Sequence, residues 1–232
     1  MDAVDNNRQK NRKTAILGIF AKQPVAGLCK TRLSPPLTLQ QAAEFYQCSL
    51  QETVQRLRGG DNYDLAICYA GERCWFEQTF PGAELIAQQG DDLGARMATA
   101  LAGFLRQGYR QAVLVGSDSP DLPLAIIDQA FAALQNSDVV LAPASDGGYV
   151  LIGESQHYPQ LFSDIAWSTS QVLGETERRI AQQSISAVRL DCWEDLDDLA
   201  SLQRFLQRSP HAMTAAYLRK HLASQFSSAD KM

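Results

Sequence analysis

Residues 111–123, QAVLVGSDSPDLP, decide the fold of this chain. The apolar run at 112–115 has the length and the β-branched content of a strand that is buried on both faces, as in a parallel sheet. Gly116 permits a sharp bend after this run, and Pro120 cannot continue a ladder of hydrogen bonds. The stretch therefore predicts a central strand with Asp118 at its carboxyl end, where open α/β sheets bind their ligands.

A second apolar run, at residues 139–142, also ends in an acidic turn, Asp146-Gly147-Gly148. Adjacent glycines let a ligand or another backbone approach closely. The Asp-Gly pair is equally typical of a tight β-hairpin turn, and both interpretations can hold together. Acidic turns after two buried strands are what a site for a metal ion and a phosphorylated ligand needs.

Composition limits the classes of protein that this chain can belong to. It has 232 residues, a net charge of −5 and 45% hydrophobic residues. That length supports a sizeable core, and we expect a single domain over residues 14–223 with flexible tails at 1–13 and 224–232. The acidic balance argues against a nucleic-acid-binding protein, which would carry a basic patch. No apolar run approaches the length of a membrane span.

The five cysteines are odd in number and have no C-x-x-C spacing. This usage argues against a disulfide framework and against a zinc site. Free thiols are typical of a reducing compartment, so we expect a cytoplasmic protein.

Strand-like and helix-like segments alternate along the chain. Apolar runs predict strands at 14–21, 64–70, 84–88, 111–116, 139–142, 149–153 and 188–190. Segments with helical periodicity lie at 39–58, 72–80, 93–105, 124–134, 170–182, 198–208 and 211–223, and Thr38 with Gln41 forms a capping-box pattern before the first. This alternation predicts a mixed, mostly parallel sheet between two layers of helices.

The loop after the first strand carries three cations, Lys22, Lys30 and Arg32, around Gly27. A phosphate-binding loop needs free backbone amides and cations that offset the charge of the ligand. The loop matches neither G-x-x-x-x-G-K-[ST] nor G-x-G-x-x-G, so a Walker ATPase or a Rossmann dehydrogenase is not indicated. From the residues alone, a phosphate-binding loop and a solvated basic loop are equal alternatives.

Two pairs of acids are candidate metal ligands. Asp118 and Asp121 follow the central strand, and their oxygen atoms suit Mg²⁺ or Mn²⁺. A turn-forming role is the alternative for Asp118, and for Asp121 we favour an acid at the start of the next helix. Near the end of the fold, Asp195 and Asp197 can point together at one ion. Capping of the following helix by Asp197 or Asp198 is an equal alternative.

The segment AKQPVAGLCKTRL at 21–33 resembles the F-A-K-x-P-x-P-G-x-V-K-T-R-L opening of a bacterial family. The resemblance continues in order through QQGDDLGARM, GSDSPDLP, SDGGYVLIG, WSTSQVL and WEDLD, and covers about residues 13–205. Ala26 and Cys29 depart from the opening motif, QQGDDLG carries one extra acid, and the family's T-P-E-D-L after Asp197 is replaced. The family contains nucleotide-diphospho-sugar transferases with a GT-A fold, of the radical-SAM/selenodomain-associated glycosyltransferase type. It is similar to the phospholactate and phosphoenolpyruvate guanylyltransferases and, more remotely, to the molybdopterin-cofactor guanylyltransferases.

The resemblance implies roles for individual residues. It implies a Mg²⁺ or Mn²⁺ ion bound by Asp118, Asp195 and Asp197. Contacts with the nucleotide are implied for Lys22, Gly27, Lys30, Arg32, Gly90 and Asp92. The side that faces the acceptor would consist of Gly147, Gly148, Tyr149, Trp167, Ser168 and Thr169. Asp118 and Asp146 are the candidate catalytic residues, with Asp146 as the base of an inverting transfer.

We therefore expect a metal-dependent transferase with a nucleotide-activated donor and a small-molecule acceptor, and the family favours glycosyl transfer. Nucleotidyl transfer from a nucleoside triphosphate to a small phosphorylated acceptor is the alternative, because it uses the same site physics. A non-catalytic nucleotide-binding module is disfavoured by the intact acids. A phosphate-switched receiver domain would need an acidic pair after the first strand, where this chain has cations. The sequence leaves the base, the sugar, the acceptor and the oligomeric state open.

Overall fold

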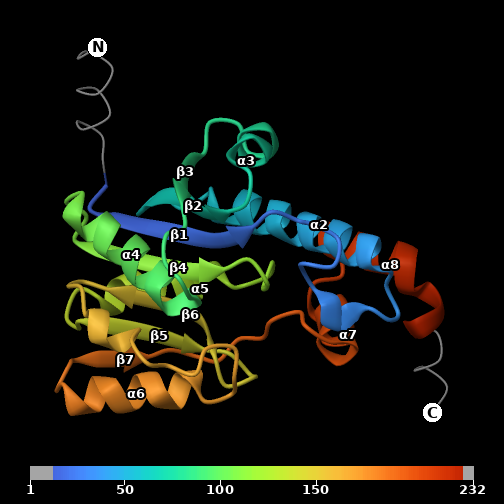
Figure 1. Cartoon of the computed structure of the whole chain (residues 1–232). Coiled ribbons are helices and arrows are strands. Elements are labelled where there is room, and N and C mark those ends of the chain that lie inside the picture. The colour runs from blue at the N-terminus through green and yellow to red at the C-terminus, as the bar shows by residue number, and fades with distance from the viewer. Residues whose placement is uncertain (1–12, 227–232) are drawn as a thin grey trace.

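A seven-stranded sheet with the strand order β3-β2-β1-β4-β6-β5-β7 organises the chain (Figure 1). The computed structural model describes residues 13–226, so most of each predicted tail lies outside the described residues. The strands are β1 (Ala15–Lys22), β2 (Asp64–Ala70), β3 (Glu84–Ala87), β4 (Gln111–Gly116), β5 (Val139–Pro143), β6 (Tyr149–Glu154) and β7 (Ala187–Arg189).

Most neighbouring strands run parallel. β1 pairs in parallel with β2 and β4, β2 with β3, and β5 with β7. β6 runs antiparallel between β4 and β5. The predicted mixed, mostly parallel sheet is confirmed, and β4, which was predicted to be the central strand, occupies its middle.

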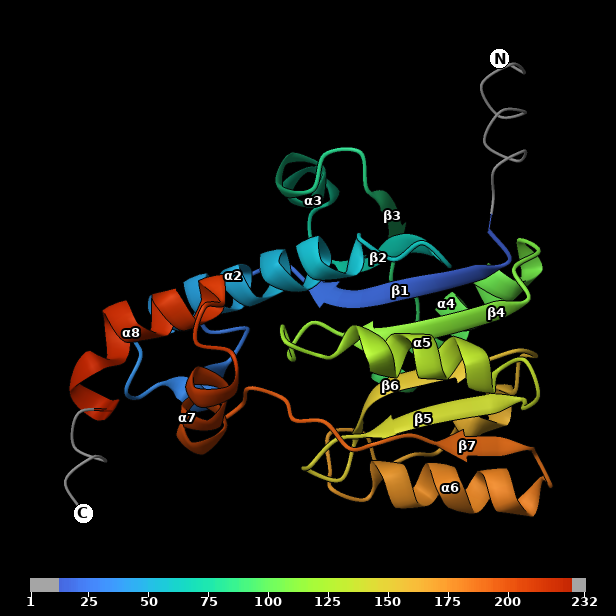
Figure 2. The same cartoon turned by 180° about the vertical axis from the view of Figure 1, so that it is seen from behind.

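Helices cover both faces of the sheet. They are α2 (Leu39–Leu57), α3 (Arg73–Thr79), α4 (Leu93–Arg106), α5 (Leu124–Ala133), α6 (Val172–Gln182), α7 (Leu199–Arg208) and α8 (Met213–Phe226), with 3₁₀ turns η1 (Thr31–Leu33) and η2 (Pro159–Leu161). α4 lies on one face (Figure 1), and α5 lies on the opposite face (Figure 2). No helix within the described range has both the length and the apolar character needed to span a bilayer.

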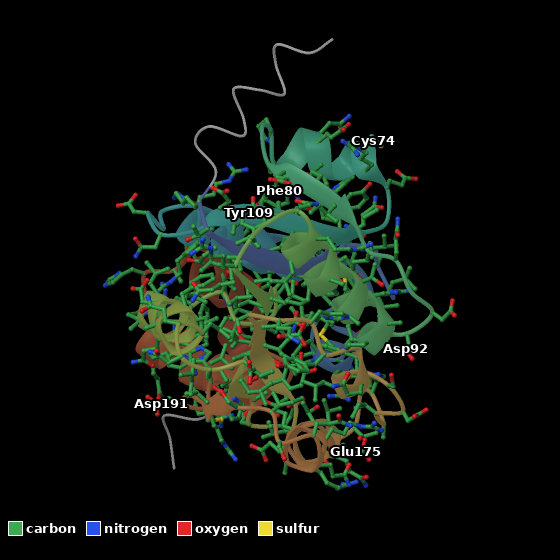
Figure 3. All side chains as sticks on the ribbon, turned by 90° about the vertical axis from the view of Figure 1, so that its left-hand side faces the viewer. Cys74, Phe80, Asp92, Tyr109, Glu175 and Asp191 are labelled. Carbon is green, nitrogen blue, oxygen red and sulfur yellow. The ribbon has the colours of Figure 1, made fainter. Side chains whose placement is uncertain are left out.

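The side chains of β4 alternate between two apolar clusters. Val113 and Val115 pack with residues of α2, α3 and α5, whereas Ala112 and Leu114 pack with residues of α4 and α6. Each of these four side chains is at most 2% exposed. Side chains fill the space on both sides of the sheet (Figure 3). A strand buried on both faces has no polar side to show, which is why the sequence of β4 is a continuous apolar run.

A third apolar cluster extends the fold beyond the sheet. Helices α7 and α8 pack there against η1 and the N-terminal part of α2 (Figure 2). Leu33 of η1, Phe45 of α2 and Phe205 of α7 are each 1% exposed or less. Leu196, which precedes α7, belongs to the same cluster and is fully buried. This cluster anchors the cationic loop and the late acidic segment side by side.

Helix capping confirms one prediction and resolves one alternative left open by the sequence. The Thr38–Gln41 capping box is present at the start of α2. Asp198, not Asp197, is the N-cap of α7, where its side chain accepts from the backbone N–H of Ser201 at 2.7 Å. Asp197 is therefore not used as the cap. α8 continues to Phe226, beyond its expected end at residue 223.

Candidate active site

A cleft of about 810 Å³ opens at the edge of the sheet where β1 and β4 end. This is the carboxyl edge of both parallel strands, where ligands bind in open α/β folds. Most of the residues proposed from the sequence line it: Lys22, Lys30, Arg32, Asp118, Asp146, Gly148, Tyr149, Trp167, Ser168, Thr169, Asp195 and Asp197. Gly27, Gly90, Asp92 and Gly147 are not part of the lining.

Lys30 is the buried cation at the base of this cleft. Its backbone is in the left-handed region, with φ at 47°, immediately before η1. Its side chain is 4% exposed, and Nζ lies 2.9 Å from Asp118 Oδ1 and 2.7 Å from Asp197 Oδ1. Nζ also donates to the carbonyl oxygen of Leu196 at 2.9 Å. Burial lowers the pKa of Lys30, but the two carboxylates raise it by more, so the ammonium stays charged.

Asp195 is an acid of the cleft lining with a raised pKa. Its Oδ1 accepts a hydrogen bond from Ser119 Oγ at 2.6 Å. Burial, reinforced by the negative charge of Asp118, raises the pKa of Asp195 to about 7, although Ser119 and Lys30 oppose the shift. The backbone N–H of Leu196 donates to the carbonyl oxygen of Asp118 at 3.0 Å. The loops after β4 and before α7 are thus joined through backbone and side chains.

The hydroxyl of Tyr46 links the ends of β1 and β4 through hydrogen bonds. The sequence indicated only core packing for this residue on α2, and the ring is indeed 2% exposed. Its hydroxyl lies 2.7 Å from Ser117 Oγ and accepts from the backbone N–H of Lys22 at 3.1 Å. Ser49, one turn along α2, donates to the carbonyl oxygen of Ser117 at 3.1 Å. A phenol in an otherwise apolar helical stripe was the signal that sequence reasoning missed.

The two predicted acceptor segments pack closely on each other. Gly147 has φ at 93°, and a Cβ there would lie 2.3 Å from the carbonyl oxygen of Ser170. Asp146 Oδ1 accepts from the backbone N–H of Gly148 at 2.9 Å, so the hairpin interpretation of this turn holds geometrically. Only glycine fits at position 147, because both its backbone angle and its surroundings exclude a side chain.

Trp167 packs against the start of α4. A Cβ on Gly94 would meet Trp167 Cζ2 at 2.3 Å, so the indole lies directly over that glycine. Asp92 is the N-cap of the same helix, and its side chain accepts from the backbone N–H of Ala95 at 2.7 Å. Asp92 lies at the rim of the molecule (Figure 3). The structure gives this acid a capping role, and the nucleotide contact proposed for it stays a prediction.

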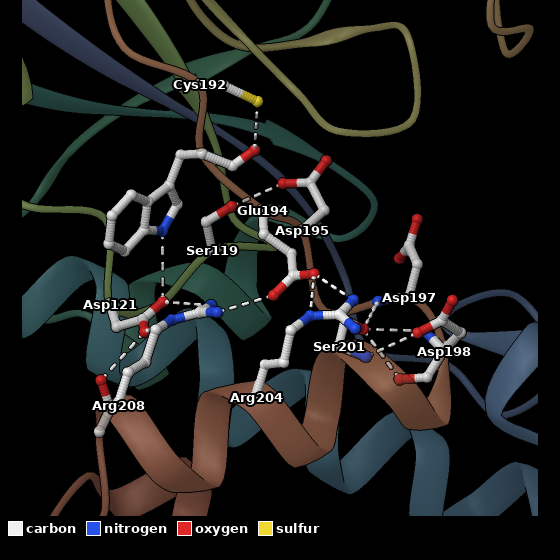
Figure 4. Close-up of polar contacts among 12 residues, drawn as sticks. Ser119, Asp121, Cys192, Glu194, Asp195, Asp197, Asp198, Ser201, Arg204 and Arg208 are labelled. Atoms are coloured by element: carbon white, nitrogen blue, oxygen red, sulfur yellow. Dashed lines mark hydrogen bonds and ion pairs between the residues drawn. The ribbon is translucent and has the colours of Figure 1, made fainter.

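The sequence-based interpretation of Asp121 was wrong. Pro123 is the N-cap of α5, and no acid lies in the first turn of that helix. Instead, Asp121 Oδ2 accepts from Arg208 Nε of α7 at 2.5 Å and from Ser209 Oγ at 2.9 Å (Figure 4). Glu194 bonds to Arg208 as well, and to Arg204. This ionic network is long-range, so no local pattern reveals it.

The family profile described as "Uncharacterized protein conserved in bacteria (DUF2064)" matches residues 53–169. The chain belongs to the DUF2064 family. It is also similar to a solved structure described as "putative nucleotide-diphospho-sugar transferase from Desulfovibrio desulfuricans G20". The two are 33% identical, with 91% of this chain and 96% of the other covered and a TM-score of 0.85. The resemblance predicted from the sequence is confirmed.

More distant structures share the fold of this DUF2064 chain. A CMP:2-keto-3-deoxy-manno-octonic acid synthetase in complex with CTP is 10% identical over 84% of this chain and 98% of its own, with a TM-score of 0.55. Rv0371c from Mycobacterium tuberculosis H37Rv, in complex with manganese, is 16% identical over 83% and 98%, with a TM-score of 0.51. No curated protein matches the chain significantly.

Proposed function

We propose that this DUF2064 protein is a metal-dependent transferase that takes its donor group from a nucleotide-activated substrate, with a nucleotide sugar as the donor. One observation carries the proposal: the cationic loop and the acids Asp118, Asp195 and Asp197 converge on one cleft at the carboxyl edge of the sheet. The enzyme class agrees with three structural neighbours, which are named as a transferase, a synthetase and a synthase.

On the donor side, Lys22 and Arg32 are cations of the loop after β1 that a phosphate can reach. Both line the cleft, and the side chain of Arg32 is 74% exposed. Arg32 Nη1 lies 3.9 Å from Asp197 Oδ2, close enough to offset part of the negative charge of the acids. A guanidinium can bind phosphate oxygens at two points and is always charged. Arg32 is therefore the first candidate for the phosphates of the donor.

The acids have the chemistry for a divalent ion. Oδ1 atoms of Asp118 and Asp197 already converge on one cation, the Lys30 ammonium. Within residues 13–226, no group of three or more His, Cys, Asp or Glu side chains is arranged to hold a metal ion. Mg²⁺ usually needs only one or two carboxylates, because substrate phosphates and water complete its shell. Such an ion would offset the charge that develops on the departing phosphate.

On the acceptor side, Asp146 is placed on the hairpin between β5 and β6 and lines the cleft. We assign Asp146 the role of the base that removes a proton from the acceptor in an inverting transfer. Trp167 lines the same side, and its buried Nε1 has no hydrogen-bond partner among the described residues. An acceptor oxygen would satisfy this donor.

Nucleotidyl transfer is the second candidate. The fold neighbours named as a 4-diphosphocytidyl-2C-methyl-D-erythritol synthase and a Leptospira borgpetersenii cytidylyltransferase favour it, with TM-scores of 0.54 and 0.53. In this reaction the acceptor attacks the α-phosphorus and pyrophosphate leaves. The protein then contributes positioning and charge stabilisation rather than covalent chemistry.

A thermal-shift panel of nucleoside diphosphates, triphosphates and nucleotide sugars, each with and without Mn²⁺, tests the proposal. A ligand that binds only the native state raises the melting temperature by mass action. We expect the largest rise with a nucleotide sugar plus Mn²⁺, and the Asp118→Asn variant should lose the Mn²⁺-dependent part. A larger response to a triphosphate than to any nucleotide sugar would favour nucleotidyl transfer. No response to any nucleotide would exclude both.

A further inference from the structure

Lys30 occupies the place between two acids that a divalent ion would need. A lysine ammonium has three N–H donors. Here Asp118, Asp197 and the carbonyl oxygen of Leu196 accept them, all within 2.9 Å. In this arrangement Lys30 has no donor left for a phosphate, so the nucleotide contact expected for it requires these bonds to break.

The two sides of this ion cluster differ in their access to solvent. The side chains of Asp118 and Asp197 are 42% and 38% exposed, and both line the cleft. The Lys30 side chain is only 4% exposed. An ion that enters from the cleft therefore reaches the carboxylates first. Because a divalent ion and the ammonium would then share the same two carboxylates, they would repel each other at short range.

The flexible side chain of Lys30 makes its release from the two acids feasible. Lys30 is held in the left-handed region, which is uncommon for a residue with a side chain and persists only where surrounding contacts impose it. Its side chain is a flexible four-carbon stem, and the segment also contributes Thr31 and Arg32 to the cleft. A freed ammonium therefore lies beside the region where donor phosphates would bind.

We propose that Lys30 is a resident cation that a divalent metal ion displaces from Asp118 and Asp197, after which its ammonium is free to pair with the phosphates of the donor. This inference rests on the proposed function: its first step on the metal site and its second step on the nucleotide donor. The first step concerns metal binding in the absence of nucleotide. Lys30 thus keeps the acids neutralised and close together until the metal arrives.

Mn²⁺ binding without nucleotide tests the first step. Free Mn²⁺ is measured by electron paramagnetic resonance in titrations of the parent protein, Lys30→Met and Lys30→Gln. Removal of the competing cation should tighten Mn²⁺ binding about tenfold or more, because like charges at contact distance interact strongly. Arg73→Met is the control, since it removes the same charge from an exposed position outside the cleft lining and should change the affinity much less.

One further variant and two contrary outcomes make this test decisive. Adding Asp118→Asn to Lys30→Met should cancel the gain, because the gain depends on that carboxylate. Unchanged or weaker Mn²⁺ binding in both folded Lys30 variants would overturn the inference. So would an equal gain in Arg73→Met, since the effect would then be one of net charge.

Lysine acetylation followed by peptide mass spectrometry tests displacement in the unaltered protein. Lys30 should be protected without metal and become reactive in saturating Mn²⁺, whereas the more exposed Lys22 should react in both conditions. Persistent protection of Lys30 in saturating Mn²⁺ would overturn displacement. Both experiments omit nucleotide. They can therefore fail while the thermal-shift panel of nucleotides succeeds, or succeed while that panel fails.

Discussion

Arg208, the last residue of α7, forms a two-point ion pair with Asp121, 87 residues earlier in the chain. Arg208 Nε donates to Asp121 Oδ2 at 2.5 Å, and Nη2 donates to Oδ1 at 3.3 Å. The Asp121 side chain is 5% exposed and also accepts from Trp193 Nε1 at 3.4 Å. The pair holds α7 against the loop after β4, and Glu194 of the acidic segment also bonds to Arg208 (Figure 4).

Replacement of Arg208 by Ala should lower the free energy of unfolding by about 3 kcal/mol, because it leaves the buried Asp121 carboxylate without its partner. Urea denaturation measures the change. Arg189→Ala is the control, since the pair of Arg189 with Glu177 is exposed and should contribute less than about 1 kcal/mol. Equal losses in the two variants would contradict a special role for the Asp121 pair.

Glu194 should make stability depend on pH in the acidic range. Hydrogen bonds from Arg204 and then Arg208 hold its pKa below the ordinary value of 4.5, against the effect of burial. The stabilisation is therefore fully present above about pH 4.5 and is lost as the pH falls through the lower pKa of the folded state. Glu194→Gln should be less stable than the parent at pH 6, and the difference should shrink towards pH 3. A difference that does not vary with pH would contradict this.

Two glycines of α4 should respond to alanine in opposite directions. Gly94→Ala should destabilise the protein and displace Trp167, because the new Cβ would lie 2.3 Å from Trp167 Cζ2 and 2.5 Å from the carbonyl oxygen of Phe162. Gly103→Ala meets nothing within 4 Å and should stabilise the helix by about 0.5–1 kcal/mol. Melting temperatures and tryptophan fluorescence measure both effects. Similar behaviour of the two variants would refute the packing argument.

Arg32→Ala should weaken nucleotide binding about tenfold at low ionic strength, and by less in high salt, where exposed charges are screened. Isothermal titration calorimetry with the best nucleotide of the panel measures the change. Arg73→Ala on α3 removes another exposed arginine that is not part of the cleft lining, and should leave the affinity unchanged. An Arg32→Ala variant that binds as the parent does at low salt would remove Arg32 from the donor site.

Local patterns predicted the scaffold because each pattern depends on nearby residues alone. The apolar run of β4, the capping box at Thr38 and the Asp-Gly turn at Asp146 all lie where the sequence placed them. The last helix, α8, was harder to delimit, because helix ends depend on packing partners. The start of α7 depended on which of two neighbouring acids caps it, and the structure selects Asp198.

Contacts between distant segments could not be predicted from the sequence. No residue near Asp121 in the sequence indicates its partner Arg208. The sequence predicted Tyr46 only as a core aromatic, whereas its hydroxyl bonds at the ends of two strands. Lys30 was expected to face a phosphate. Its burial against Asp118 and Asp197 depends on how the third apolar cluster brings η1 against the segment before α7.

The sequence by itself determined the order of strands and helices, the family, and the set of acids and cations near the carboxyl edge of the sheet. Hydrophobic periodicity and turn chemistry act over a few residues, so they can be read from the chain directly. Only the tertiary structure decided which charges meet. An ion pair between segments 167 residues apart, such as Lys30 with Asp197, forms because packing elsewhere brings the two together. No spacing in the chain encodes that distance.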